Sequence, residues 1–212
     1  PGPDGAVDWP AYGGEVGGSR YLPVAAIDTT NVRRLERAWT YRTRETEPDF
    51  ATAEPTSFQS TPIAIDGVLY FNTPLGRVIA LDGASGDELW AFDPGIRRDV
   101  TYGDHASRGV SSWVDAAAEP DAPCRHSIFV ATPESQLIRL DARNGDLCLA
   151  FGDGGMVSLL AGLRIPPFEA EAYSMTSPPL VADGLVVVGS SIGDNSRPSP
   201  ASGEVRAYDA RT

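Results

Sequence analysis

Residues 80–90 read Ala-Leu-Asp-Gly-Ala-Ser-Gly-Asp-Glu-Leu-Trp, which predicts a strand ending in Asp, a tight turn and a second strand. Residues 139–147 read Arg-Leu-Asp-Ala-Arg-Asn-Gly-Asp-Leu, and residues 207–212 read Ala-Tyr-Asp-Ala-Arg-Thr, so the pattern occurs three times. The three Asp residues, at positions 82, 141 and 209, lie 59 and 68 residues apart. Repeats of this length with several strands each are typical of β-propeller blades. One blade cannot bury both of its faces, so we expect the chain to form part of a ring. We expect Trp90, at the end of the first copy, to pack between neighbouring blades, and we expect a weaker contact at the second copy, which has Leu149 at the matching position.

Two matched dipeptides support this interpretation. Asp66-Gly67 separates apolar runs at 61–65 and 68–71, and Asp183-Gly184 separates runs at 179–182 and 185–189. Asp-Gly between apolar runs is a strong hairpin signal, because a two-residue primed turn needs positive φ. We predict the remaining strands at 35–42, 77–82, 88–92, 109–114, 127–132, 136–141, 147–151 and 204–209. The fold class is therefore all-β, with four-stranded antiparallel blades.

Composition limits the classes of function. The chain has 212 residues, 42% hydrophobic and 22% charged, which is ordinary for a folded domain. Its net charge of −12 argues against nucleic acid as a partner, because a phosphate backbone would be repelled. All basic residues other than His are Arg, so no Lys nucleophile is present, and no apolar run reaches the length of a membrane span. From the residues alone, Cys124 and Cys148 could be bridged or could be two buried thiols.

Three motifs together resemble a known family. These are the turn that ends in Trp90, the opening run Asp-Trp-Pro-Ala-Tyr-Gly at 8–13, and His105-x-x-Arg108-Gly-Val-Ser. They resemble quinoprotein dehydrogenases, and the similarity extends from Asp8 to Asp209. The resemblance implies about three blades of a roughly eight-bladed propeller that binds pyrroloquinoline quinone (PQQ) and a Ca²⁺ or Mg²⁺ ion. It implies a lead-in with one strand (1–58), a first blade (59–98), a second blade with a cofactor-side loop (99–160) and a truncated third blade (161–212).

The resemblance also assigns candidate site residues. Arg108 has the planar fork that matches the carboxylates of PQQ, and His105 titrates near neutrality, as a proton-transfer group should. Gln59 stands where the alcohol-oxidising branch has Glu, and it keeps an acceptor while adding donors. Asp194, with Asn195 as the alternative, is the expected metal ligand. The further cofactor contacts are expected at Thr176 and Ser191. Taken alone, His105 and Arg108 are more often a loop His and a surface ion pair, and His126 is expected to be structural.

The resemblance is closest to the glucose, quinate and polyol branch. An adjacent Cys pair of the alcohol-oxidising branch is absent between Asp104 and Ser107, and the Cys124–Cys148 pair recurs in the sugar branch, which favours a disulfide. We expect the N-terminal segment of a periplasmic enzyme, anchored in the membrane through a segment outside this chain. That enzyme would oxidise a sugar, polyol or cyclic hydroxy acid hydroxyl to a carbonyl and pass electrons to a membrane quinone.

Two alternatives remain at this stage. The catalytic Asp of the family and its further metal ligands belong to later blades, so the segment alone is expected to be inactive and to need the remaining blades of its parent. A non-enzymatic propeller of the same ancestry, acting as a binding or assembly scaffold, is the alternative function. A scaffold would not need His105, Arg108 and Asp194 together.

Overall fold

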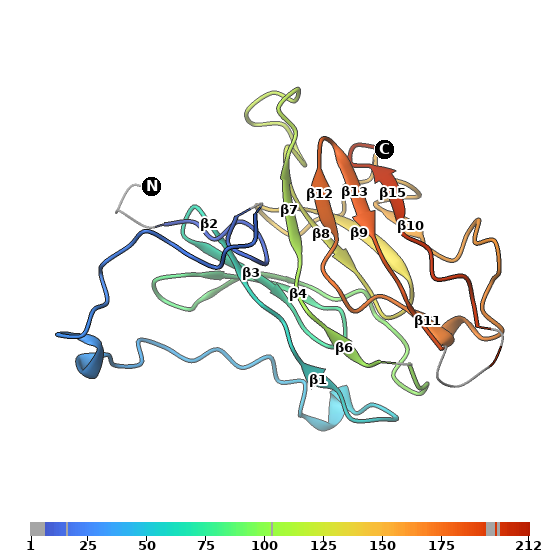
Figure 1. Cartoon of the computed structure of the whole chain (residues 1–212), viewed down its shortest axis with the longest axis horizontal. Coiled ribbons are helices and arrows are strands. Elements are labelled where there is room, and N and C mark those ends of the chain that lie inside the picture. Colours follow the sequence, from blue (N-terminus) through green and yellow to red (C-terminus); the bar gives the residue numbers. More distant parts are fainter. Residues whose placement is uncertain (1–6, 16, 103, 194–197, 199) are drawn as a thin grey trace.

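The computed structural model describes residues 7–15, 17–102, 104–193, 198 and 200–212. The described part is built from short β-strands in five sheets, with only three single turns of 3₁₀ helix. The larger sheets lie one beside the next in sequence order, and the lead-in runs along one side of them (Figure 1). This arrangement confirms the all-β prediction.

The first blade is complete. Its sheet has the order β2 (Ile63–Ile65), β3 (Val68–Asn72), β4 (Val78–Asp82) and β5 (Glu88–Phe92), and every neighbouring pair is antiparallel. The β2–β3 hairpin turns at Asp66 and Gly67, whose φ angles are 51° and 80°. Such positive φ values at both central residues belong to a type I′ turn, as the Asp-Gly signal predicted.

The second blade is also a four-stranded antiparallel sheet, but its last strand differs from our prediction. The sheet runs β7 (Ser111–Val114), β8 (His126–Ala131), β9 (Gln136–Asp141) and β10 (Met156–Ser158). The segment 147–151, predicted as the fourth strand, keeps only one bridge, between Leu147 and Leu140. The chain instead turns through three glycines with positive φ at 152, 154 and 155, and β10 takes the place beside β9.

The third sheet has three strands, β12 (Leu180–Ala182), β13 (Leu185–Val188) and β15 (Arg206–Asp209). Its hairpin turns at Asp183 and Gly184 with φ of 50° and 75°, which repeats the turn of the first blade. Two small sheets complete the description. One pairs β1 (Ser57–Phe58) with β6 (Ala106–Ser107) in parallel, and the other pairs β11 (Tyr173–Ser174) with β14 (Ser191–Ile192) antiparallel.

The lead-in lacks the strand predicted at 35–42. That segment pairs with no strand, yet Trp39 and Tyr41 pack on the core of the first blade, and the Tyr41 hydroxyl donates to Glu88 of the edge strand β5. The helical turns are η1 (Val32–Arg34), η2 (Pro48–Phe50) and η3 (Ala170–Ala172). In the part of the chain that the structure describes, no helix has the length and apolarity needed to cross a membrane.

The Asp of each repeated turn has a local structural role. Oδ1 of Asp82 accepts the backbone N–H groups of Ala84 and Ser85, at 3.0 and 2.8 Å. Oδ1 of Asp141 and of Asp209 likewise accepts the N–H two residues further along the chain, at 3.0 and 2.7 Å. A short carboxylate that bonds its own backbone stabilises such turns, which explains why the repeat requires Asp.

The core lies between the blades. One cluster joins Tyr70 and Trp90 of the first blade to Ile128 and Leu140 of the second, and another joins Phe129 of the second to Val186 of the third. Trp90 covers the turn of the next blade, where its Nε1 donates to the Ala142 carbonyl at 3.0 Å. These contacts between neighbouring sheets confirm the docking role predicted for Trp90.

Candidate cofactor site

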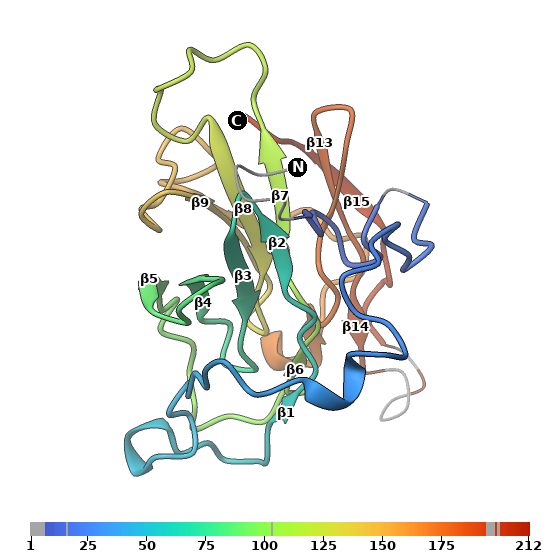
Figure 2. The ribbon, with the colours of Figure 1, turned by 90° about the vertical axis from the view of Figure 1, so that its left-hand side faces the viewer.

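The segments that begin the three blades meet at one side of the molecule. In Figure 1, β1, β6 and β11 lie along the same side of the ribbon. The view in Figure 2 also has β1 and β6 side by side, and in their parallel pairing Phe58 faces Ser107. The backbone continues this row: Thr61 donates to the Arg108 carbonyl at 3.0 Å, and Arg108 donates to the Thr176 carbonyl at 3.0 Å. Gln59, Arg108 and Thr176 therefore come from three adjacent segments, one before each sheet.

Gly109 allows this close approach. Its φ is +149°, and a Cβ added there would lie 3.2 Å from the Thr61 carbonyl oxygen. A side chain would be strained in this backbone conformation and would push the first segment away. The Arg-Gly pair of the motif is thus explained by the packing of adjacent segments.

Among the described residues, the only charged partner of the Arg108 guanidinium is a distant one. About a third of its side chain is exposed (35%), and it contacts the carboxylate of Asp104 at 3.4 Å. A half-exposed pair at this distance contributes little to stability, about 0–1 kcal/mol. The guanidinium is therefore available to a second anionic group.

His105 is buried, with 6% exposed, and it differs from Arg108 in its surroundings. Neither ring nitrogen has a hydrogen-bond partner in the part of the chain that the structure describes, and the ring packs edge-on against Tyr102 with centroids 5.0 Å apart. Burial lowers the pKa of the imidazole, although Glu54 and Asp104 act in the opposite direction. Side chains alternate along an extended segment, so His105 and Arg108, three residues apart, are expected on opposite faces. Asp104 is the group that contacts Arg108.

The other predicted residues lie in the same region with fewer contacts. Gln59 is exposed, and its amide donates to Ser57 Oγ at 2.9 Å. Thr176 and Ser191 are half-buried, and Ser191 faces Ser174 across the β11–β14 pair. The predicted metal ligand Asp194 and its alternative Asn195 lie outside the described residues. Within the described ranges, no group of three His, Cys, Asp or Glu side chains gathers to hold a metal ion.

Sequence reasoning missed a polar cluster beside this row. Asn72 is fully buried at the end of β3, where its Nδ2 donates to Ser107 Oγ and its Oδ1 accepts from Ser60 Oγ at 3.1 Å. This cluster connects the first blade to β6 at Ser107, the residue directly before Arg108. The available signal was an Asn that ends an otherwise apolar strand.

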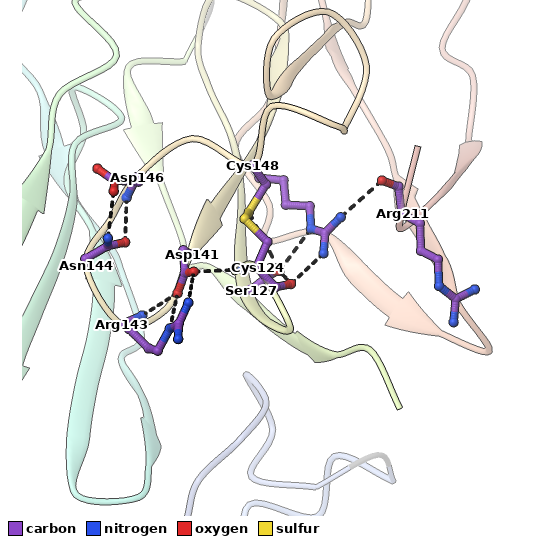
Figure 3. The surroundings of a disulfide bond; sticks show 9 residues. Cys124, Ser127, Asp141, Arg143, Asn144, Asp146, Cys148 and Arg211 are labelled. Atoms are coloured by element: carbon purple, nitrogen blue, oxygen red, sulfur yellow. Dashed lines mark hydrogen bonds and ion pairs between the residues drawn. A yellow bond between two sulfur atoms is a disulfide. The ribbon is translucent and has the colours of Figure 1, made fainter. Parts of the chain in front are cut away.

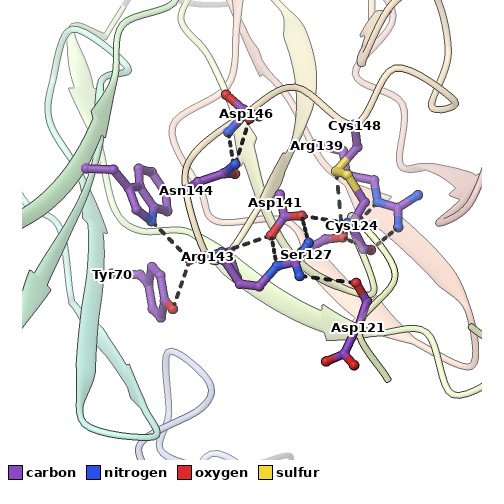
Figure 4. A network of polar contacts seen from close by, with 12 residues as sticks. Tyr70, Asp121, Cys124, Ser127, Arg139, Asp141, Arg143, Asn144, Asp146 and Cys148 are labelled. Atoms are coloured by element: carbon purple, nitrogen blue, oxygen red, sulfur yellow. Dashed lines mark hydrogen bonds and ion pairs between the residues drawn. A yellow bond between two sulfur atoms is a disulfide. The ribbon is translucent and has the colours of Figure 1, made fainter. Parts of the chain in front are cut away.

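Cys124 and Cys148 form a disulfide, in agreement with the resemblance (Figure 3). Two groups of the second blade hold the Cys124 backbone: its N–H donates to Asp141 Oδ2 at 2.7 Å, and its carbonyl accepts from Arg139 at 2.6 Å. Arg139 is 5% exposed and also donates to Ser127 Oγ at 2.9 Å (Figure 4). Its third bond, 3.1 Å to the Arg211 carbonyl, reaches the turn of the third sheet.

Comparison with known proteins decides the family. The family model of the glucose/ethanol/alcohol dehydrogenase β-propeller domain with PQQ matches residues 9–212. The chain belongs to this PQQ dehydrogenase family. It is 34% identical to quinoprotein glucose dehydrogenase of Escherichia coli over 210 residues, which are 97% of this chain and 26% of that protein. It is 32% identical to the glycerol dehydrogenase large subunit of Gluconobacter thailandicus, with 97% and 27% covered.

Two further relatives have similar identity to this chain and similar coverage. Quinate/shikimate dehydrogenase (quinone) of Acinetobacter baylyi is 31% identical, with 97% of this chain and 27% of that protein covered. The structure of quinohemoprotein alcohol dehydrogenase from Comamonas testosteroni superimposes with a TM-score of 0.72 at 25% identity, covering 96% of this chain and 26% of that one. The chain thus spans about a quarter of the length of these relatives, and it has the fold of a partial propeller.

The described residues fit PQQ in their chemistry. A tricarboxylate needs cationic donors, and Arg108 has a guanidinium with only a distant carboxylate partner. A ligand oxygen needs unpaired polar groups, and Ser190, directly before Ser191 of β14, has a buried hydroxyl with no partner among the described residues. The metal ion has no such test here, because Asp194 lies outside the described residues.

Proposed function

We propose that this chain is the N-terminal segment of a PQQ-dependent dehydrogenase that oxidises a hydroxyl of a sugar, polyol or cyclic hydroxy acid to a carbonyl. Electrons would pass to a membrane quinone. The names of the glucose, glycerol and quinate relatives support this substrate range. The disulfide supports a periplasmic location, because such bonds persist in oxidising compartments. Membrane anchoring would come from a segment outside this chain.

One observation carries the proposal. The row of segments formed by Thr61, Arg108 and Thr176 presents an under-paired guanidinium at the start of three adjacent blades. A packed scaffold has no need to leave an Arg without a close partner at such a junction. A binding site for an anionic ligand does need one.

The chain's residues have separate roles in this proposal. Arg108 binds a carboxylate of the cofactor, with Gln59, Thr176 and Ser191 as further polar contacts. PQQ would supply the electron-accepting ortho-quinone, and Asp194 would help to hold a Ca²⁺ or Mg²⁺ ion that would supply Lewis-acid chemistry. His105 serves as the proton-transfer residue, and burial keeps its imidazole neutral and able to accept a proton. The neighbouring carboxylate of Asp104 is the competing proton acceptor, because it is the group that contacts Arg108.

The test uses the complete protein of which this chain is a segment, with PQQ, Ca²⁺ or Mg²⁺, and dye reduction as the measure of turnover. Glucose, glycerol and quinate are the substrates. We expect Arg108→Met to weaken PQQ binding about 10- to 100-fold, the value of a lost charge-assisted hydrogen bond. His105→Gln is expected to lower kcat at least about 100-fold with PQQ binding nearly unchanged. Neither binding nor turnover in the unmodified protein would contradict the proposal and favour a scaffold.

Matched variants separate the neighbouring groups. His126 is the second His of this chain, and its Nε2 is already bonded to Ser112 Oγ at 2.9 Å. His126→Gln should therefore leave kcat within about twofold. If Asp104→Asn abolishes turnover while His105→Gln does not, the proton-transfer role belongs to Asp104.

A further inference from the structure

Tyr102 is the aromatic neighbour of the buried His105. Its ring meets the imidazole at 67° with centroids 5.0 Å apart, and only 2% of Tyr102 is exposed. An edge-to-face contact of this kind favours one relative orientation of the two rings. His105 has no hydrogen bond at either nitrogen, so this ring contact is the specific contact that the structure gives its imidazole.

Tyr102 is itself fixed by groups from neighbouring blades. Its hydroxyl lies 3.0 Å from Glu134 Oε1 and 3.0 Å from the Arg97 carbonyl. Glu134, in the turn between β8 and β9, also accepts the Arg97 N–H at 2.9 Å. The Arg97 guanidinium pairs in turn with Glu171 of η3. Tyr102 is thus held by the segment after β5 and by the second blade, and Arg97 links both to the segment before the third sheet.

We propose that Tyr102 is a positioning residue that holds the imidazole of His105 in one orientation and keeps water from it. Glu134 anchors Tyr102 in this role. The inference rests on the proposed function only for its catalytic consequence, since the packing of the two rings stands on its own. A residue that orients a proton-transfer group and excludes water from it acts through that group and needs no contact with substrate.

Burial and the nearby charges determine in which direction the pKa of His105 should change when Tyr102 is replaced. Burial lowers its pKa, while the carboxylates of Glu54 and Asp104 raise it. Tyr102 contributes to the burial and stays neutral, because its own burial and the Glu134 carboxylate raise its pKa above the usual value. Removal of the Tyr102 ring admits water and leaves both carboxylates in place, so the pKa of His105 should rise toward the usual value of an exposed imidazole.

Diethyl pyrocarbonate measures this effect at His105 directly. The reagent acylates only neutral imidazole, so the dependence of the modification rate on pH reports the pKa, and its limiting rate reports access. Peptide mass spectrometry of the complete protein follows His105 and His126 separately. For Tyr102→Leu we expect the limiting rate at His105 to rise at least about tenfold and the midpoint to move upward. His126 should change by less than about twofold.

Tyr102→Phe keeps the ring and removes its anchor, so it should raise the His105 rate about threefold. This milder change also keeps the test open if Tyr102→Leu does not fold. An unchanged rate and midpoint at His105 in the folded variants would overturn the inference. The modification needs no PQQ, so it decides the role of Tyr102 even if the complete protein shows no turnover. If the complete protein turns over, the acidic limb of the plot of kcat against pH should move to higher pH together with the modification midpoint. A purely structural role of Tyr102 would not require this shift.

Discussion

Trp90 lies directly on Gly145: a Cβ added to this glycine would come within 2.6 Å of Cε3 of the indole. Gly145 has a φ of +76°, and Trp90 donates to the carbonyl of Ala142 in the same turn at 3.0 Å. Trp39 covers Gly86 in the same manner and donates to the Gly83 carbonyl at 3.2 Å. In the first two repeated turns, the Gly is therefore the surface on which a Trp from the preceding segment packs.

Gly145→Ala should destabilise the junction between the first two blades. The new methyl group overlaps the indole, and an L side chain is strained at this φ, so the free energy of unfolding should fall by about 2–4 kcal/mol. Urea denaturation followed by Trp fluorescence measures this change. Gly67→Ala is the matched control, since Gly67 has a φ of +80° but no atom within 4 Å of an added Cβ. It should cost only about 1–2 kcal/mol. Equal costs at both positions would show that Trp90 does not confine Gly145.

The sequence was sufficient for elements that depend on local chemistry. Asp66-Gly67 and Asp183-Gly184 form the predicted hairpins because their φ requirement is local, and Trp90 docks as the spacing indicated. The strands predicted at 35–42 and 147–151 were wrong because a strand needs a neighbour to pair with. Residues 35–42 pack on the first blade through their side chains without joining its sheet, and β10 takes the edge beside β9. The alternation of apolar residues within a segment does not show whether that segment joins a sheet or which segment takes the edge position.

The candidate site also contains features that the sequence predicted and contacts that it did not. The structure places the segments of Gln59, Arg108 and Thr176 side by side through backbone hydrogen bonds, while the roles of these side chains in binding a cofactor stay a prediction. The ring contact between Tyr102 and His105 had no sequence signal, because it depends on a loop closing back on itself. Arg139 was missed as well. The sequence indicated the role of Arg139 only by placing an Arg within the otherwise apolar part of the strand Gln136–Asp141.

Arg139 occupies the junction where the second repeat lacks its Trp. Leu149, at the matching position, is 72% exposed, whereas buried Arg139 reaches the Arg211 carbonyl of the third sheet. Both guanidinium groups lie over the Trp113 ring, with Cζ of Arg139 and of Arg211 at 5.1 and 5.5 Å from its centroid. The weaker contact expected from the missing Trp is thus replaced by a polar one.

Arg139→Met should lower the free energy of unfolding by about 2–4 kcal/mol, because it removes the charged donor of three hydrogen bonds, to Ser127 Oγ and to the carbonyls of Cys124 and Arg211. The Cys124 carbonyl then keeps only the Ser127 hydroxyl as a donor. Urea denaturation monitors the loss. Arg164→Met is the control, since that side chain is 81% exposed and its pairing with Glu204 should contribute less than about 1 kcal/mol. A cost for Arg139→Met no larger than the control's would refute the role of Arg139 at this junction.

Loss of the Cys124–Cys148 bond should weaken the same junction, because the Cys124 carbonyl is an acceptor for Arg139. Closing a 24-residue separation contributes about 3 kcal/mol in the chain-entropy model. The double variant Cys124→Ser/Cys148→Ser should therefore have a lower urea midpoint than the unmodified protein. A thiol reductant should remove most of that difference. If the midpoints already agree under oxidising conditions, the bond does not stabilise the fold.

The ion pair between Asp115 and Arg211 predicts a pH dependence. Arg211 donates to both carboxylate oxygens of Asp115 at 2.7 Å, which lowers the pKa of that carboxyl to about 2 against the opposing effect of burial. The unfolded value is about 3.9, so the unfolded chain binds the proton first as the pH falls. The stability that the pair contributes is therefore complete above about pH 5 and is lost as the pH falls from about 4 to about 2. Urea midpoints of the unmodified protein and of Asp115→Asn, compared across pH, measure this. Their difference should be constant from pH 5 to 7 and should shrink below about pH 4, whereas a difference that stays constant down to about pH 2 would show that Arg211 does not hold the carboxylate in its charged form.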